Sequence, residues 1–287
     1  ITLLGLYHRY AVQAERGDLA ALDAYDRALR DFGSEITARW QDRLEVEPTT
    51  PWSAFAWRST WEVPLLLAKT RTFRALLTGA WSQAEEGLEE TQQLAADDPN
   101  FLNTYAGQLL FLRREQGRVD ELLPVAILAV QDPDALPAYH AAIAMLRADR
   151  GDLDDARADL RHICADGFAL LPRDHTWLAA VTMLAEVAAA CSERSVAAAL
   201  LEELQPHEGH LVIVANHLAC AGAVDRYLGL LESTLGLHED ARRHFETALE
   251  LEGAIESPPL QTRTRYWYGR SLLSVDEPSS AFEACRQ

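Results

Sequence analysis

The sequence predicts an all-α fold built from about six or seven antiparallel helix hairpins packed in series. A short pattern recurs along the chain, in which a glycine is followed by small or apolar residues five, nine and twelve positions later. Successive copies begin 38, 34, 41, 44 and 40 residues apart, a period typical of stacked helix hairpins. Strand-like sequence is nearly absent, since the one β-like run, Leu211–Val214, stands in a helical context.

The recurring pattern fixes where each hairpin turns. Its clear copies are Gly79/Ala84/Leu88/Thr91, Gly117/Leu122/Ala126/Ala129, Gly151/Ala156/Leu160/Ile163 and Gly236/Ala241/Phe245/Ala248. Two further copies are Ser192/Ala197/Leu201/Leu204, with serine in the place of glycine, and the truncated Asp276/Ala281/Cys285. We expect the first residue of each copy in the tight turn between two helices, where glycine adopts a left-handed backbone at least cost. The small residues then let the second helix approach the first closely.

The whole chain, residues 1–287, is expected to form one such array, with regular repeats over 65–287. Residues 1–64 form an irregular first repeat, because 62 residues separate Gly17 from Gly79 and 33–63 hold an aromatic-rich insertion with four tryptophans. A second irregular stretch, His207–Val224, lengthens the connection between two repeats and carries its own glycines.

The composition restricts the class of partner. Lys and Arg number 26 against 44 Asp and Glu, so the net charge is −18 and nucleic-acid binding by this region is not expected. No run of eighteen apolar residues occurs, so no membrane-spanning helix is predicted. The four cysteines are widely spaced and favour reduced thiols in a cytoplasmic protein. Lys69 is the only lysine, a bias that suggests a bacterium of high GC content.

The glycine, small and large positions resemble the tetratricopeptide repeat. The likeness is best at Leu228–Gly229, at Gly236, Ala241, Phe245 and Ala248, and at Tyr268–Gly269. This resemblance implies a right-handed superhelical solenoid whose first helices line a concave face.

Several short sequence segments also resemble the C-terminal helical-repeat arm of large bacterial regulators, which join an ATPase module to a LuxR-type helix-turn-helix or a nucleotide-cyclase domain. They include Leu112–Arg118, Asp166–Phe168, Arg226–Leu231, His244–Glu246 and Thr264–Tyr266. The resemblance covers roughly 65–287 and implies a sensor or interaction arm. No ATPase or DNA-binding part is visible in this chain.

The sequence motifs predict neither an enzyme nor a cofactor. The phosphate-binding loop and the common hydrolase, zinc-protease and dinucleotide motifs are all missing. His207, His210, His217 and Cys220 could suggest zinc, but their spacing fits no strong template. Independent loop histidines and a buried cysteine are therefore the preferred interpretation, and no metal is predicted.

The concave face supplies the candidate binding residues. By the geometry of the resembled repeat, they are Arg114, Arg226, Arg263, Tyr266 and Arg270. Arginines on such a wall could hold a carboxylate or phosphate in bidentate geometry. Alternatively, they pair with neighbouring acids such as Asp225 or Glu232, or contact a further repeat.

These observations predict a non-catalytic arm that binds a protein, a peptide or a small anionic effector. A free-standing scaffold working by protein–protein contact is the second hypothesis. An α-helical enzyme with its active site in the groove is the third, but it needs clustered carboxylates or histidines. An exposed end of the array could also support homo-oligomers.

Overall fold

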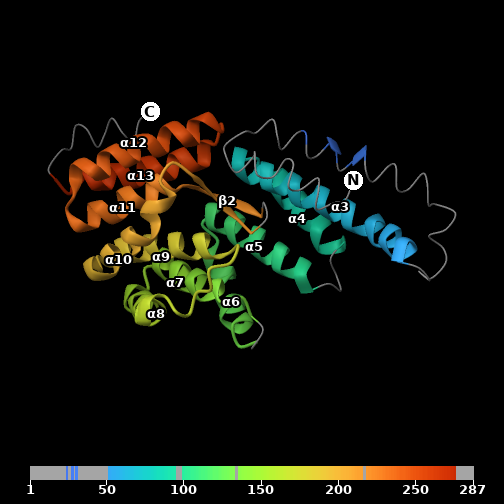
Figure 1. Cartoon of the computed structure of the whole chain (residues 1–287), viewed down its shortest axis with the longest axis horizontal. Helices are drawn as coiled ribbons and strands as arrows, with labels where there is room; N and C mark the ends of the chain where they lie inside the picture. Colours follow the sequence, from blue (N-terminus) through green and yellow to red (C-terminus); the bar gives the residue numbers. More distant parts are fainter. Residues whose placement is uncertain are drawn as a thin grey trace. The chain divides into compact units, whose positions relative to one another are not determined.

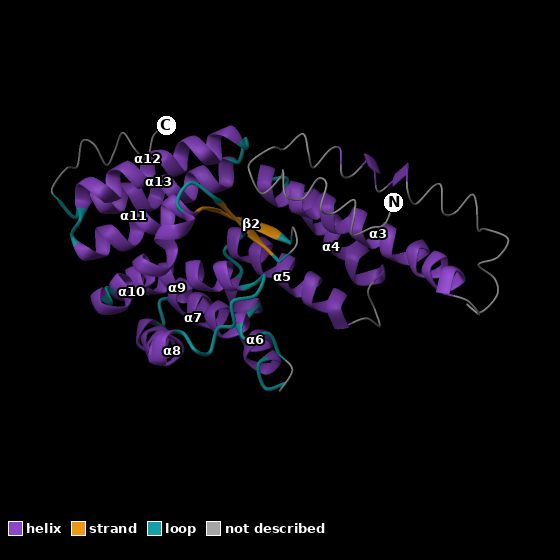
Figure 2. Ribbon diagram, in the orientation of Figure 1, coloured by secondary structure: helices purple, strands orange, loops and turns teal. Residues whose placement is uncertain are grey.

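The computed structural model describes residues 51–94, 99–132, 135–215 and 218–275, together with residues 24, 27, 28, 30 and 31. Within these ranges the chain is predominantly helical, with eleven α-helices and one two-stranded sheet (Figures 1 and 2). Two compact units divide it: residues 1–112 with 217–219, and residues 113–216 with 220–287. The expected features at Gly17 and Asp276, and residues 33–50 of the insertion, lie outside the described residues.

The first unit is built around a helix hairpin. Its helices are α3 (Pro51–Thr78), α4 (Trp81–Leu94) and α5 (Pro99–Glu115), the last of which belongs to this unit as far as Leu112. Gly79 turns the chain between α3 and α4 with φ of 76°. The two helices cross closely at Gly87, where an added Cβ would lie 2.2 Å from Oγ1 of Thr72. Residues 51–63 of the aromatic-rich insertion form the first part of helix α3.

The second unit packs helices in the order of the chain. These are α6 (Leu123–Ala129), α7 (Ala138–Arg150), α8 (Leu153–Cys164), α9 (Trp177–Cys191), α10 (Arg194–Leu204), α11 (Val224–Leu235), α12 (His238–Ala254) and α13 (Pro258–Leu273). The helices pair as α7 with α8, α9 with α10, and α11 with α12. The first helices also pack in series, from α7 to α9 to α11 to α13.

The predicted turns are confirmed. Gly117, Gly151 and Gly236 have φ of 69°, 87° and 81°. Ser192 ends α9 in the same left-handed conformation, with φ of 56°, so serine does stand in the place of glycine.

The spacing after each turn also matches burial. The residues at five, nine and twelve positions after Gly151 and Gly236 are all buried. Gly229 lets α11 cross α12, because an added Cβ would lie 3.0 Å from the carbonyl oxygen of Ala241. The copy after Gly117 departs from the pattern, since Ala129 is exposed. A 3-10 turn at Val119–Glu121 delays the start of α6 and leaves it only seven residues long.

The expectation of helix at Leu211–Val214 is wrong. This run is strand β1, which pairs with strand β2 (Ala219–Ala223). Its valines and isoleucine fit a pleated surface well. In β2, Gly222 has φ of 100°, and an added Cβ would lie 2.4 Å from a guanidinium nitrogen of Arg226. The hairpin occupies the irregular stretch 207–224.

None of the helices in the described ranges combines the length and the hydropathy needed to cross a lipid bilayer.

Candidate functional site

Two of the predicted arginines meet at one buried glutamate in the second unit. Glu186 is the only charged residue of α9 and is 4% exposed. Arg114, at the end of α5, donates to Glu186 and also to Asp149, with Nε 2.5 Å from Oδ2. Arg263, on α13, lies with Nη1 3.8 Å from Glu186 and Nη2 2.5 Å from Oε1 of Glu115. Four helices, α5, α7, α9 and α13, thus meet through one ion-pair cluster.

This cluster neutralises its own arginines. Burial alone would raise the pKa of Glu186, but the charges of Arg114 and Arg263 outweigh it and lower that pKa to about 2. Burial likewise opposes the charge of Arg114, but Glu186 and Asp149 raise its pKa overall. Two guanidinium groups face three carboxylates, so the cluster has no excess positive charge with which to attract an anionic ligand.

Arg226 does not face a groove, contrary to the sequence prediction. It is 1% exposed and donates to the carbonyl of Ala221 and, at 2.9 Å, to the hydroxyl of Tyr227. Its acidic partner is Glu252, with Nη1 3.4 Å from Oε1. Arg226 therefore holds β2 against α11 and α12, and it cannot reach a dissolved ligand in this conformation.

Tyr266 and Arg270 remain at the surface of α13. Tyr266 is 54% exposed, and its hydroxyl oxygen accepts a hydrogen bond from Nη1 of Arg270 at 3.4 Å. The guanidinium of Arg270 lies 5.8 Å from the centre of the Tyr266 ring and 5.1 Å from that of Trp267. Among the described residues no carboxylate pairs with Arg270. The exposed Leu273 extends this face by one turn.

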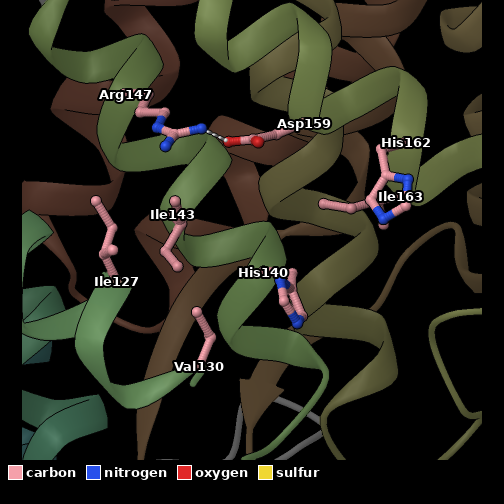
Figure 3. Close-up of a pocket in the computed structure, with 8 residues that line it drawn as sticks. All are labelled: Ile127, Val130, His140, Ile143, Arg147, Asp159, His162 and Ile163. Carbon is pink, nitrogen blue, oxygen red and sulfur yellow. Dashed lines mark hydrogen bonds and ion pairs between the residues drawn. The ribbon is translucent and has the colours of Figure 1, made fainter.

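A small hollow between α6, α7 and α8 offers no comparable site (Figure 3). Its volume is about 160 Å³, and it is lined by Ile127, Val130, His140, Ile143, Arg147, Asp159, His162 and Ile163. Drug-sized ligands occupy roughly 300–1,000 Å³. Its only ion pair joins Arg147 to Asp159, with Nη1 2.5 Å from Oδ2. This hollow is too small to enclose such a ligand.

The histidines considered for zinc do not gather with Cys220 in the part of the chain that is described. The ring of His207 packs 5.8 Å from that of Trp177, and His210 bonds to backbone carbonyls through Nδ1. Burial raises the pKa of Cys220 to about 12, so its thiol is protonated and a weak metal ligand. His217 lies outside the described residues.

A different set of side chains comes together nearby. Glu208, Asp225 and His244 each place a ligand atom within 4.8 Å of the others. Sequence spacing did not reveal this set, because its members lie on a turn and on two different helices. The available signal for this set was a pair of carboxylates, Asp225 and Glu232, seven residues apart on the buried face of α11. Buried carboxylates need polar partners close by.

Comparison of the sequence with known proteins identifies no family. No protein-family model matches this chain, and no curated protein matches it significantly. The assignment of function therefore depends on the residues themselves.

Proposed function

We propose that this chain is a non-catalytic helical-repeat module that binds an acidic peptide segment of a partner protein. The binding surface is the α13 face, defined as Tyr266, Trp267, Arg270 and Leu273. In this proposal the hairpins form a tetratricopeptide-like, right-handed solenoid. The module is the cytoplasmic interaction arm of a bacterial signalling or transcriptional regulator, as the resemblance of 65–287 implies.

Arg270 is the observation that carries the proposal. Of the four predicted arginines, Arg114, Arg226 and Arg263 are used in ion pairs inside the second unit. Arg270 is exposed, and its guanidinium lies against two aromatic rings instead of a carboxylate. A guanidinium oriented in this way keeps its outer N–H groups available for a carboxylate.

Charge distribution supports an acidic partner. The chain has a net charge of −18, yet α13 contains three arginines, of which Arg263 is paired with Glu115, and no aspartate or glutamate. An acidic segment would therefore be directed toward this helix and away from the rest of the surface. The phosphate backbone of a nucleic acid would meet the same repulsion over a much larger area.

The shape of the surface favours a peptide over a small anion. Tyr266 and Leu273 are exposed next to Arg270, and they offer apolar contact to side chains flanking a carboxylate. Aromatic residues and arginine are the residue types that contribute most binding energy at protein interfaces. A small effector would need an enclosing pocket, and the 160 Å³ hollow lies on other helices.

A peptide array with fluorescence anisotropy tests the proposal. Acidic peptides would be compared with counterparts in which every Glu and Asp is replaced by Gln and Asn. We expect binding of acidic members only, weakened at least tenfold by Arg270→Glu. Arg161→Glu is the charge-reversal control, because Arg161 is also exposed but lies on α8, where it pairs with Glu193.

Equal affinity of the wild type and Arg270→Glu would contradict the proposal. Identifying the domains encoded next to this region in the full gene product would distinguish the two hypotheses, a regulator arm and a free-standing scaffold. A tight complex with a small anion and none with peptides would favour the effector-binding alternative.

A further inference from the structure

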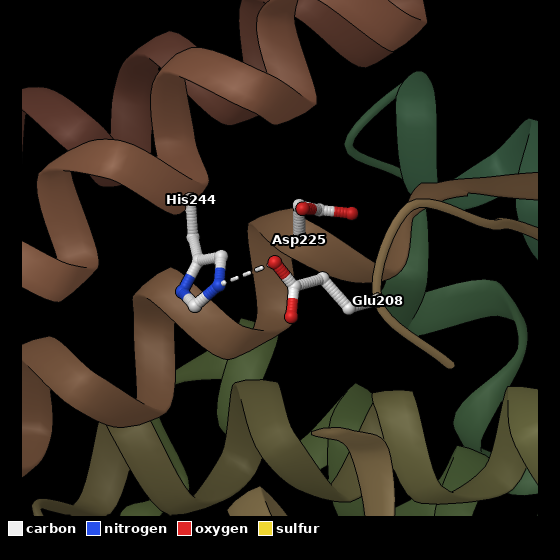
Figure 4. Close-up of side chains that lie close together, drawn as sticks. All are labelled: Glu208, Asp225 and His244. Atoms are coloured by element: carbon white, nitrogen blue, oxygen red, sulfur yellow. Dashed lines mark ion pairs between the residues drawn. The ribbon is translucent and has the colours of Figure 1, made fainter. Parts of the chain in front are cut away.

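A three-residue cluster lies where the turn after α10 meets α11 and α12 in the second unit (Figure 4). Glu208 follows the 3-10 turn Gln205–His207, Asp225 lies in the first turn of α11, and His244 lies in α12. Nε2 of His244 is 3.5 Å from Oε1 of Glu208. All three ligand atoms lie within 4.8 Å of one another.

Two buried atoms in this cluster lack a hydrogen-bond partner among the described residues. They are Oδ1 of Asp225 and Nε2 of His244. Asp225 is 0% exposed and His244 is 5% exposed, so water does not readily satisfy either group. Buried polar atoms are nearly always paired, and two orphans facing one point suggest a bound species there.

The other sides of these two groups are held in place. Nδ1 of His244 donates to Oε2 of Glu232 at 2.6 Å, and Oδ2 of Asp225 accepts the N–H of Gly209 at 2.8 Å. A proton on Nδ1 leaves the lone pair of Nε2 free to bind a cation. Metal-binding histidines are oriented by the same kind of carboxylate, bonded to the second ring nitrogen.

We infer that Glu208, Asp225 and His244 form a binding site for a divalent transition metal of the zinc class, with Glu232 as the positioning residue. Two carboxylate oxygens and one imidazole nitrogen suit Zn²⁺, and water completes the coordination at the exposed side of Glu208. Metal–ligand bonds of about 2.0–2.2 Å need ligand atoms about 3–3.5 Å apart. Glu208 and His244 already have this separation, at 3.5 Å, so only the separation from the Asp225 oxygen, which is at most 4.8 Å, has to shorten by small side-chain rotations.

Such an ion would tie the turn after α10 to α11 and α12. This connection carries the β-hairpin, which follows directly from the turn. The metal site is distinct from the α13 face, so the inference of metal binding does not depend on peptide binding.

A proton is the competing occupant. Burial disfavours the charged form of His244, but the hydrogen bond and charge of Glu232 raise its pKa overall. Burial also raises the pKa of Asp225, which the Gly209 N–H offsets only in part. A doubly protonated His244 would then link Glu232 to Glu208 without any metal.

Titration calorimetry of the chelator-treated chain with Zn²⁺ decides between the two occupants. We expect one ion per chain, affinity at least tenfold weaker in Glu208→Gln, and at least hundredfold weaker in Asp225→Asn. Both variants are nearly isosteric, and the amide of the second still accepts the Gly209 N–H. His162→Gln is the control, since His162 is exposed on α8.

Two further measurements make the result decisive. At a hundredfold excess over the wild-type dissociation constant, Zn²⁺ should raise the melting temperature of the wild type by about 5–10 °C and that of Asp225→Asn by less than about 2 °C. Bound Co²⁺ should show visible bands without a thiolate charge-transfer band. Wild-type affinity no tighter than that of Asp225→Asn would overturn the inference, as would binding abolished by thiol alkylation.

Discussion

Replacing Glu186 with glutamine should destabilise the second unit by about 3 kcal/mol at neutral pH. The magnitude follows from the pKa of Glu186, which drops from its ordinary value of 4.5 to about 2 in the folded chain. Each pH unit of that difference corresponds to about 1.4 kcal/mol, so the folded state favours the charged form by about 3 kcal/mol. Glutamine keeps the size of the side chain and removes the charge that Arg114 and Arg263 face.

The contribution of Glu186 to stability depends on pH. Because the folded pKa is below the unfolded one, the contribution is complete above about pH 4.5 and is lost as the pH falls toward 2. The stability difference between wild type and Glu186→Gln should therefore shrink to about 1.5 kcal/mol near pH 3.

Urea unfolding followed by circular dichroism measures this difference. Titrations at pH 7 and pH 3 avoid the isoelectric region near 4.8, where the chain carries little net charge. Glu246→Gln is the control, because Glu246 pairs with Arg242 at the surface and the amide oxygen of glutamine can still accept the Tyr268 hydroxyl. This substitution should change stability by less than about 0.5 kcal/mol. A pH-independent difference, or one below about 1 kcal/mol, would refute the reasoning.

Three other substitutions test local packing and buried charge in the two units. Gly222→Ala should lower the free energy of unfolding by at least about 2 kcal/mol, because alanine at this φ is strained and its Cβ clashes with Arg226. Gly151→Ala should lower it by about 1 kcal/mol, because the added Cβ meets open space and only the φ is strained. Chemical denaturation of both variants checks this, and equal costs would contradict it. Lys69→Met should stabilise the chain by about 1–3 kcal/mol at pH 7, because burial lowers the pKa of Lys69 from 10.5 to about 8. Wild-type stability should rise between about pH 8 and 10.5 as the folded state releases this proton first, and a flat profile would count against it.

The hairpin turns were predictable because their cause is local. A left-handed residue between two helices selects glycine, and Ser192 adopts the same backbone at the position that the spacing assigns to it. The β-hairpin was not predictable in the same way. Its second strand, Ala219–Ala223, has little strand propensity and is fixed by its pairing with Leu211–Val214 and by the close approach of Arg226 to Gly222.

The candidate site was predictable in position but not in chemistry. The repeat register placed Arg114 and Arg263 on one face, and both side chains meet at Glu186. The repeat register alone cannot distinguish arginines that are free to bind a ligand from arginines that are neutralised by ion pairs within the fold. That distinction came from Glu115 and Asp149, whose pairing partners are distant in sequence.

The most direct test of the account is the affinity of an acidic peptide for the wild type and for Arg270→Glu, measured by anisotropy at physiological salt. We predict at least tenfold weaker binding for Arg270→Glu, unchanged binding for Arg161→Glu, and no binding of the neutral peptide. The same affinity for all three proteins would contradict the claim that the α13 face is the binding surface.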